Sequence, residues 1–183
     1  MKKILTGAVA LSVLFAGAAY ASLSVGTKAP DFTAQASLGG KDFTFSLADA
    51  LKKGPVVLYF YPAAFTKGCT IEAHDFAEAT DRYKALGATV IGVSHDDIAT
   101  LDKFSVSDCR SKFAVAADPD QKVIKAYDAV LQKAPQYSDR TSYVIAPDHS
   151  IVFTYTNLDP DAHVALTMQA VQDWRDTHGR KKH

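Results

Sequence analysis

The sequence predicts one α/β domain with a mixed central β-sheet flanked by helices. Short apolar runs of strand character alternate with segments of helical periodicity, and no repeat, low-complexity tract or linker interrupts them. Two hairpin signals, one early and one late, add antiparallel strands to the strand–helix–strand units between them. A length of 183 residues with 48% hydrophobic residues fits a single domain with a full core.

The first part of the domain has the signals of a hairpin, a short helix and a central strand. A glycine pair inside SLGGKDFTFS (37–46) lies between extended segments and predicts the hairpin. A helix over 46–53 would begin at a serine suited to N-capping and end at a glycine. The run PVVLYFY over 55–61 is apolar throughout, which is typical of a strand buried on both faces.

A long helix and a second buried strand are expected next. Apolar residues recur three or four positions apart over 69–86, and a glycine follows, which indicates a helix that ends there. The run ATVIGVS over 88–94 predicts the strand. The remaining elements expected in chain order are a helix over 97–108, a strand over 113–117, a short helix over 121–127, a hairpin formed by 141–146 and 150–156, and an amphipathic helix over 161–177.

The N-terminus has the pattern of a secretory signal peptide. Lys2 and Lys3 precede a charge-free apolar segment that ends in Ala-Tyr-Ala at 19–21. Cleavage after Ala21 would leave a domain of residues 22–183 without a stable membrane anchor, in the periplasm or secreted. An uncleaved anchor is the alternative, and the small residues at the cleavage site favour cleavage. No cysteine precedes Cys69, which excludes a lipid attached at that point.

Several functional classes have no support in the sequence. The formal net charge is zero, so no nucleic-acid partner is expected. There is no P-loop, and no G-x-G-x-x-G follows a strand, so no nucleotide cofactor is expected. Cys69 with His74, and His95 beside Asp96 and Asp97, come nearest to a metal-binding set. Neither has the spacing of a four-ligand zinc site, so the expectation is no metal.

Cys69 ends the stretch PAAFTKGC (62–69), between the predicted central strand and the long helix. This loop lies at the carboxyl edge of the sheet, where open α/β folds place their sites. The N-terminus of a helix favours a thiolate over a thiol, and the helical spacing to Phe76 puts the sulfur on the buried side. A reactive cysteine is the favoured interpretation. A small core residue and half of a structural disulfide remain open, because exported proteins are commonly oxidised.

The same stretch resembles the active-site motif of a known family. Pro62, Thr66 and Cys69 match the pattern P-x-x-x-(T/S)-x-x-C of peroxiredoxins, and Glu72 follows as in C-x-x-E. The segment RTSYVIAPDHSIVFTY, which begins at Arg140, resembles the arginine and strand of that family. The resemblance extends over about 26–174 and is strongest to the bacterioferritin-comigratory (PrxQ) subgroup.

The resemblance implies a thioredoxin-like fold and a thiol-dependent peroxidase. Cys69 would attack a hydroperoxide and become a sulfenic acid. Arg140 would favour the thiolate and donate hydrogen bonds to the departing oxygen, while Glu72 would orient the arginine. The Thr66 hydroxyl would hold the peroxide in line, and Pro62 would shield the thiolate. From the residues alone, the alternatives are that Thr66 is only a helix cap and that Pro62 only ends a strand.

The sequence offers one candidate for the residue that resolves the sulfenic acid. Many members of the subgroup have a resolving cysteine at the position of His74, so Cys109 is the remaining candidate for a disulfide with Cys69 during turnover. The alternatives are a one-cysteine enzyme with an inert Cys109, and a non-catalytic module with a permanent disulfide. A thiol–disulfide oxidoreductase would need C-x-x-C, which is absent at Cys69. The expected partners are a hydroperoxide and an external thiol or thioredoxin-like reductant, and the subgroup favours a monomer over a dimer.

Overall fold

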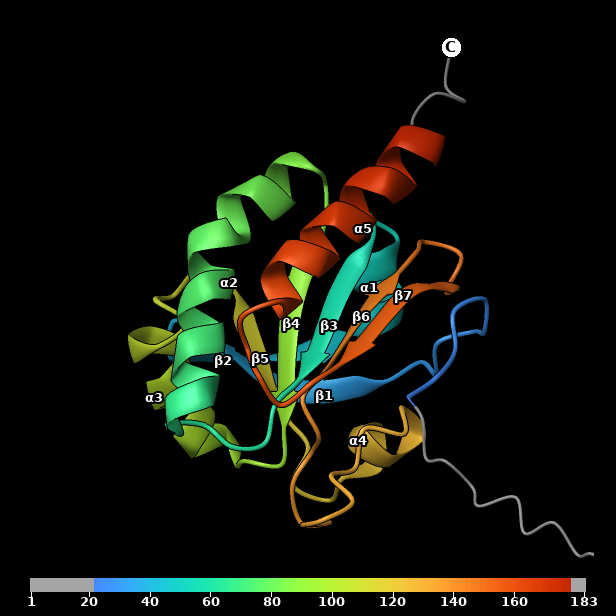
Figure 1. Cartoon of the computed structure of the whole chain (residues 1–183). Helices are drawn as coiled ribbons and strands as arrows, with labels where there is room; N and C mark the ends of the chain where they lie inside the picture. The colour runs from blue at the N-terminus through green and yellow to red at the C-terminus, as the bar shows by residue number, and fades with distance from the viewer. Residues whose placement is uncertain (1–21, 179–183) are drawn as a thin grey trace, which may run out of the picture.

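Within residues 22–178, which the computed structural model describes, seven strands form one mixed sheet in the order β2-β1-β5-β4-β3-β6-β7 (Figure 1). The predicted signal peptide lies outside the described residues. The strands are β1 (Thr33–Leu38), β2 (Lys41–Ser46), β3 (Val56–Phe60), β4 (Thr89–Ser94), β5 (Ala114–Ala117), β6 (Thr141–Ile145) and β7 (Ile151–Thr156).

The pairing of the strands confirms the predicted mixed sheet. β3, β4 and β5 are parallel, as strands joined by helical crossovers must be. β6 pairs with β3 in the antiparallel sense, and β7 pairs with β6 in the same way. The early hairpin, β1 with β2, attaches antiparallel to β5 through only two residue pairs. The two hairpins therefore extend a short parallel centre on both sides.

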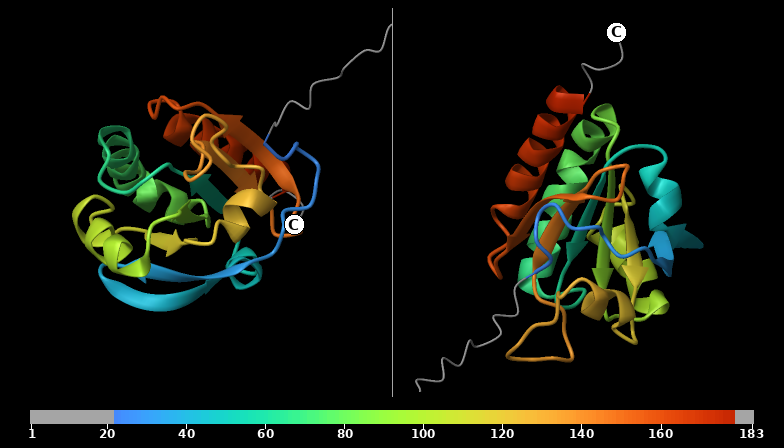
Figure 2. Two further views of the ribbon diagram at one scale, coloured as in Figure 1. Left: turned by 90° about the horizontal axis from the view of Figure 1, so that it is seen from below. Right: turned by 90° about the vertical axis from the view of Figure 1, so that its right-hand side faces the viewer.

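Five helices in the described part of the chain cover the two faces of the sheet. Figure 2 shows α2 and α5 on one side and α1 on the other. None of the helices in residues 22–178 is long and apolar enough to cross a membrane. The helices are α1 (Leu47–Leu51), α2 (Lys67–Ala85), α3 (Ile98–Ser107), α4 (Lys122–Ala126) and α5 (His163–His178).

The central strand β3 divides the core into two layers. Its side chains alternate in direction, as a strand requires, and all five are buried. Val56, Leu58 and Phe60 pack with residues of α1 and α4. Val57 and Tyr59 pack on the other face with residues of α2, α3 and α5. The apolar run found in the sequence is thus a strand covered on both faces.

The main difference from the sequence prediction is the start of α2. The helix begins at Lys67, two residues before the expected Cys69, because Thr66 is extended (φ −79°, ψ 150°) and takes the N-cap position. Cys69 is therefore the third residue of the helix. The early hairpin also begins sooner, at Thr33, since the first residues of β1 are small or polar and only partly buried and give little apolar signal.

Candidate active site

Cys69 and Arg140 meet at one end of the sheet, although 71 positions separate them in the chain. Strands β3 and β4 both end at this edge, the lower one in Figure 1, and the loop after β3 leads into α2. The register pairs Phe60, the end of β3, with Thr141, the start of the antiparallel β6. Arg140, directly before Thr141, is therefore held beside the loop that leads to Cys69.

The sulfur of Cys69 is buried in the first turn of α2. The residue is only 1% exposed, and its thiol is free. The first bond inside the helix joins the Thr70 N–H to the Thr66 carbonyl (2.9 Å), so the N–H groups before it have no partner in the helix. The Thr66 side chain accepts no capping hydrogen bond from them, and its hydroxyl donates to the Ala63 carbonyl (3.0 Å). The helix N-terminus is thus available to a ligand or a negative charge.

Three hydrogen bonds fix the guanidinium of Arg140. One Nη donates to Cys69 Sγ at 3.5 Å, the other donates to the Glu72 carboxylate, and Nε donates to the Leu158 carbonyl at 2.9 Å. The arginine is 4% exposed, so its charge is directed at the sulfur with little screening by solvent. A Cβ atom at Gly68 would lie 3.0 Å from an Nη atom, so the glycine allows this close approach.

Glu72 lies one helical turn after Cys69 and is fully buried. Burial raises the pKa of its carboxyl to about 8, while the charge and hydrogen bond of Arg140 act in the opposite direction. Its Oε2 accepts from Arg140, and its Oε1 has no hydrogen-bond partner among the described residues. The two carboxyl oxygens of Glu72 therefore have different environments, because only Oε2 binds the arginine.

His163, at the start of α5, lies 3.7 Å from the free oxygen of Glu72 but does not pair with it as a charge. Its Nε2 is 2.8 Å from the Asn157 carbonyl, which can only accept, so Nε2 carries the proton. Its Nδ1 then accepts from the Ser142 hydroxyl at 2.8 Å. Burial lowers the pKa of His163 to about 4, so the imidazole is neutral near pH 7. Sequence reasoning missed both His163 and Ser142, which no motif marks.

The loop before α2 is tied to the end of β4. The carbonyl of half-buried Pro62 accepts from His95 Nδ1 at 3.0 Å. The N–H of Ala64 donates to the Asp96 carboxylate at 2.8 Å, and the Ser94 hydroxyl donates to the same oxygen at 2.7 Å. These bonds fix the loop backbone just before Thr66 and Cys69.

His95 and Asp96, which the sequence suggested as a weak metal-binding set, bind the backbone of this loop instead. Both residues follow a buried strand directly, and this position in the sequence could have indicated that they contact the neighbouring loop. Across residues 22–178, no three His, Cys, Asp or Glu side chains gather in a way that could hold a metal ion. His74 is half-buried on α2.

Residues 25–154 match the AhpC/TSA family. The chain belongs to this family. It is similar to the chloroplastic peroxiredoxin Q of Triticum aestivum, with 34% identity over 152 residues that cover 82% of this chain and 68% of the relative. It is also similar to a putative peroxiredoxin bcp of Helicobacter pylori, with 42% identity over 107 residues that cover 58% of this chain and 67% of the relative.

Solved peroxiredoxin structures share the fold. The crystal structure of peroxidoxin BcpB from Mycobacterium tuberculosis superposes with a TM-score of 0.74 at 26% identity, covering 81% of this chain and 96% of that one. A PrxQ from Xylella fastidiosa gives a TM-score of 0.75 at 23% identity, covering 84% and 98%. The predicted peroxiredoxin family, PrxQ-like subgroup, thioredoxin-like fold and thiol-dependent peroxidase activity are confirmed.

The second cysteine of this peroxiredoxin lies directly after α3. Cys109 is fully buried, and burial raises the pKa of its thiol, with the nearby charge of Asp108 adding to the effect. Both cysteines are free thiols and belong to one packed cluster with Tyr61 and Phe104. The Thr70 hydroxyl donates to the Asp108 carboxylate at 2.6 Å. Because Thr70 follows Cys69 and Asp108 precedes Cys109, this bond joins the two chain segments that carry the thiols.

The carboxyl of Glu72 should make the stability of this peroxiredoxin depend on pH. Its pKa is about 8 when folded and 4.5 in its ordinary state. Its contribution to the free energy of unfolding is therefore complete below about pH 4.5 and is lost as the pH rises through about 8. In urea unfolding between about pH 5 and pH 9, wild type should lose stability relative to Glu72→Gln up to about pH 8 and then level off. If the difference in unfolding free energy between wild type and Glu72→Gln did not change with pH, the raised pKa of Glu72 would be contradicted.

Proposed function

We propose that this peroxiredoxin is an exported enzyme that reduces hydrogen peroxide and organic hydroperoxides through Cys69, with Cys109 resolving the product as an intramolecular disulfide. The observation that supports the first part best is the contact between the Arg140 guanidinium and Cys69 Sγ (3.5 Å) at the N-terminus of α2. A positive charge and a helix N-terminus at one sulfur both favour the thiolate, which is the nucleophile in this chemistry.

In the first step, the Cys69 thiolate attacks one oxygen of the hydroperoxide. The S–O bond forms as the O–O bond breaks, which leaves a sulfenic acid on Cys69 and releases an alkoxide or hydroxide that takes up a proton. Arg140, already donating at the sulfur, stabilises the charge on the departing oxygen. Its Nε bond to the Leu158 carbonyl and its Nη bond to Glu72 keep it in position.

The loop residues hold the peroxide in line with the sulfur. The Thr66 hydroxyl already donates to the Ala63 carbonyl, so its oxygen accepts the O–H of the incoming peroxide. The N–H groups of the first turn of α2, which have no partner in the helix, would donate further hydrogen bonds to the peroxide. Pro62, half-buried and anchored through its carbonyl to His95, keeps water away from the thiolate.

In the second step, the Cys109 thiol attacks the sulfenic sulfur of Cys69. The S–S bond forms, the S–O bond breaks, and water leaves with the thiol proton. A disulfide requires the Cα atoms of the two cysteines to lie within about 7 Å of each other, and a local shift of the end of α3 would bring the sulfurs into range. The Thr70–Asp108 hydrogen bond supports this route, because it keeps the two segments adjacent in the reduced protein. An external thiol or thioredoxin-like reductant then restores both thiols.

Intact-mass spectrometry after one equivalent of hydrogen peroxide tests the resolving step. Wild type should lose the mass of two hydrogens, and Cys109→Ser should instead gain one oxygen, because its sulfenic acid has no second thiol to react with. A lasting sulfenic or sulfinic adduct on Cys69 in wild type would contradict the disulfide. That result would assign the chain to the one-cysteine type.

The proposed export is supported by the N-terminal sequence, in which Lys2 and Lys3 precede an apolar segment and the Ala-Tyr-Ala site at 19–21. These residues lie outside those that the structure describes. N-terminal sequencing of the protein recovered from the periplasm or the medium should give Ser22 as the first residue. Recovery of the uncleaved chain in the cytosol would overturn the proposal. Size-exclusion chromatography of the same material should give the mass of a monomer.

A further inference from the structure

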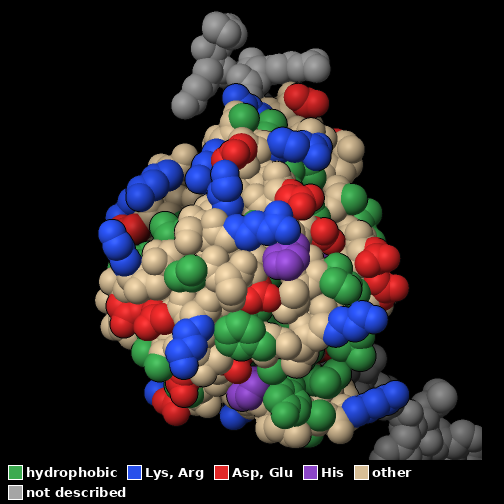
Figure 3. Space-filling view, turned by 90° about the vertical axis from the view of Figure 1, so that its left-hand side faces the viewer, with side chains coloured by type: hydrophobic (Ala, Val, Ile, Leu, Met, Phe, Trp, Pro, Cys, Tyr) green, Lys and Arg blue, Asp and Glu red, His purple; other side chains and the backbone are tan. Residues whose placement is uncertain are grey.

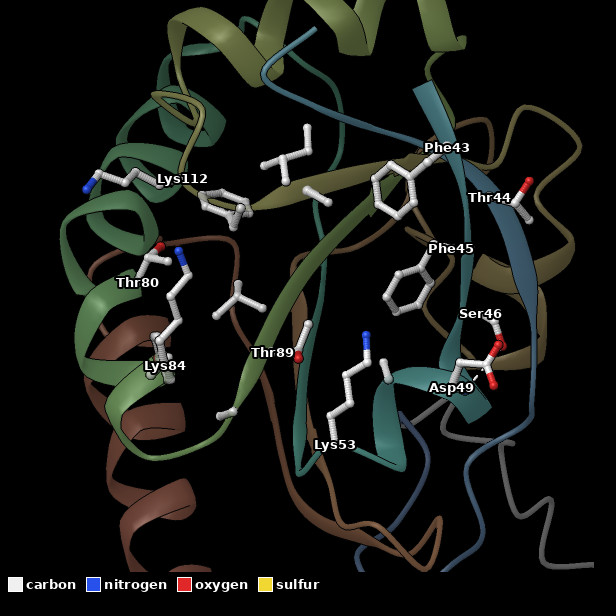
Figure 4. Close-up of a pocket in the computed structure, with 17 residues that line it drawn as sticks. Phe43, Thr44, Phe45, Ser46, Asp49, Lys53, Thr80, Lys84, Thr89 and Lys112 are labelled. Carbon is white, nitrogen blue, oxygen red and sulfur yellow. Dashed lines mark hydrogen bonds between the residues drawn. The ribbon is translucent and has the colours of Figure 1, made fainter. Parts of the chain in front are cut away.

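A cleft lies far from Cys69, toward the opposite end of α2. This cleft has a volume of about 410 Å³ and is lined by the β1–β2 hairpin, α1, the C-terminal half of α2 and the first residues of β4 and β5 (Figure 4). Thr80 and Lys84 of α2 line it, and they follow Cys69 by 11 and 15 positions. At 1.5 Å per residue, they lie about 16 and 22 Å further along the helix. The cleft is therefore separate from the peroxide site.

The lining of the cleft is mainly apolar and aromatic. Phe43 and Phe45 project from the edge strand β2 toward it, since residues two apart on a strand share a face (Figure 4). Phe113 and Val90 form buried parts of the lining, whereas Phe43 and Leu38 remain 40% and 41% exposed. Apolar side chains that remain exposed in a hollow, as Leu38 and Phe43 do here, are typical of a site that covers them with a ligand.

The charged groups around the cleft are mostly positive. Three lysines line it, and the single carboxylate there, Asp49, is held by Lys52 at 2.7 Å. Lys112 pairs with Asp81 at 3.4 Å, whereas Lys53 and Lys84 have no ion-pair partner among residues 22–178. Figure 4 shows Lys53 directed toward the centre of the cleft, near Phe45. Figure 3 shows lysine and arginine side chains gathered in the upper half of the face that carries α2 and α3, toward the C-terminal end of α2.

We propose that this cleft binds an amphipathic anion with a single alkyl tail and a carboxylate head, as in a medium-chain fatty acid. The alkyl tail covers the exposed side chains of Leu38 and Phe43, and the carboxylate pairs with Lys53 or Lys84. A neutral chain would leave both ammonium groups without a partner, and a cationic head would be repelled by them. The volume is within the range of about 300–1,000 Å³ that is typical of small-molecule sites. The proposal does not depend on the peroxidase reaction.

Calorimetric titration of the full chain with dodecanoate, below its micelle concentration, tests the proposal. The double variant Lys53→Glu/Lys84→Glu should weaken binding by roughly tenfold or more, since reversing the charges costs the head-group pairing. Phe43→Asn should weaken it as well, through lost apolar contact. Lys103→Glu/Lys125→Glu, with the same charge change at exposed lysines outside the cleft, should bind as wild type does. Comparison among variants removes any contribution from the apolar N-terminal segment, which all of them share.

The competing occupants are separated by the choice of probe. Dodecyltrimethylammonium has the same tail with a cationic head and should bind much more weakly than dodecanoate. Equal binding of the two, no binding of dodecanoate, or an unchanged affinity in the lysine double variant would overturn the proposal. Tighter binding of an acidic peptide such as hexaglutamate would also overturn it and would assign the cleft to an acidic protein segment. Circular dichroism of every variant verifies that the fold is retained.

Discussion

Peroxide consumption with dithiothreitol as reductant should fall by at least about 10³-fold when Cys69 is replaced by Ser, because removing the nucleophile of an enzyme has an effect of that order or larger. A serine hydroxyl keeps the size and position of the thiol, but it does not ionise near neutral pH and cannot form a sulfenic acid. Arg140 donates its hydrogen bond to the sulfur of Cys69, whereas burial raises the pKa of the Cys109 thiol and disfavours its thiolate.

The matched control for this prediction is Cys109→Ser. Cys109 has no part in the first step, so this variant should still consume peroxide when dithiothreitol reduces the sulfenic acid directly. Both variants replace a buried sulfur by oxygen and should lose similar stability, which thermal unfolding can verify. Full activity in Cys69→Ser, or equal losses in the two variants, would contradict the assigned role of Cys69.

Replacing Arg140 by Gln should lower the second-order rate constant for peroxide by about 10²- to 10³-fold, the usual cost of removing one donor to a developing negative charge. The guanidinium donates to Cys69 Sγ and is held by the Leu158 carbonyl and by Glu72. An amide cannot make all three bonds and carries no charge to favour the thiolate. Stopped-flow measurement of the oxidation step gives the rate constant directly.

Two further variants make the arginine result specific. Arg110→Gln removes an arginine that pairs with Glu78 on the surface and should leave the rate constant unchanged. Arg140→Gln also leaves Glu72 buried without its partner, which lowers stability, so the double variant Arg140→Gln/Glu72→Gln separates the two effects. It should regain stability without regaining rate. Recovery of the rate in the double variant would show that Arg140 acts only through the fold.

The sequence was sufficient to predict the sheet and the position of Cys69. The run over 55–61 has an apolar side chain at every position after its proline. A short run of this kind is typical of a central strand that is buried on both faces. The placement of Cys69 followed from that strand and from the helical spacing to Phe76. The start of α2 was predicted two residues late, because a cap depends on the backbone of Thr66 rather than on an apolar pattern.

The contacts that surround the sulfur could not be predicted in the same way. Arg140 was identified only through the family resemblance. Its hydrogen bond to the Leu158 carbonyl uses a backbone atom of a loop, and the residue types of that loop do not predict it. The neutral His163 beside Glu72 follows from the docking of α5 against β6. Such contacts join residues far apart in the chain, whereas the periodicity of apolar residues predicts only local helices and strands.

The most direct test of the account is the identity of the atom that peroxide oxidises. Cys109→Ser treated with one equivalent of hydrogen peroxide, without reductant and in the presence of dimedone, should carry the dimedone adduct on the peptide that contains Cys69. The double variant with Cys69→Ser should remain unlabelled. An adduct that does not depend on Cys69, or no adduct while peroxide is still consumed, would contradict the central claim that the Cys69 thiolate is the group that reduces peroxide.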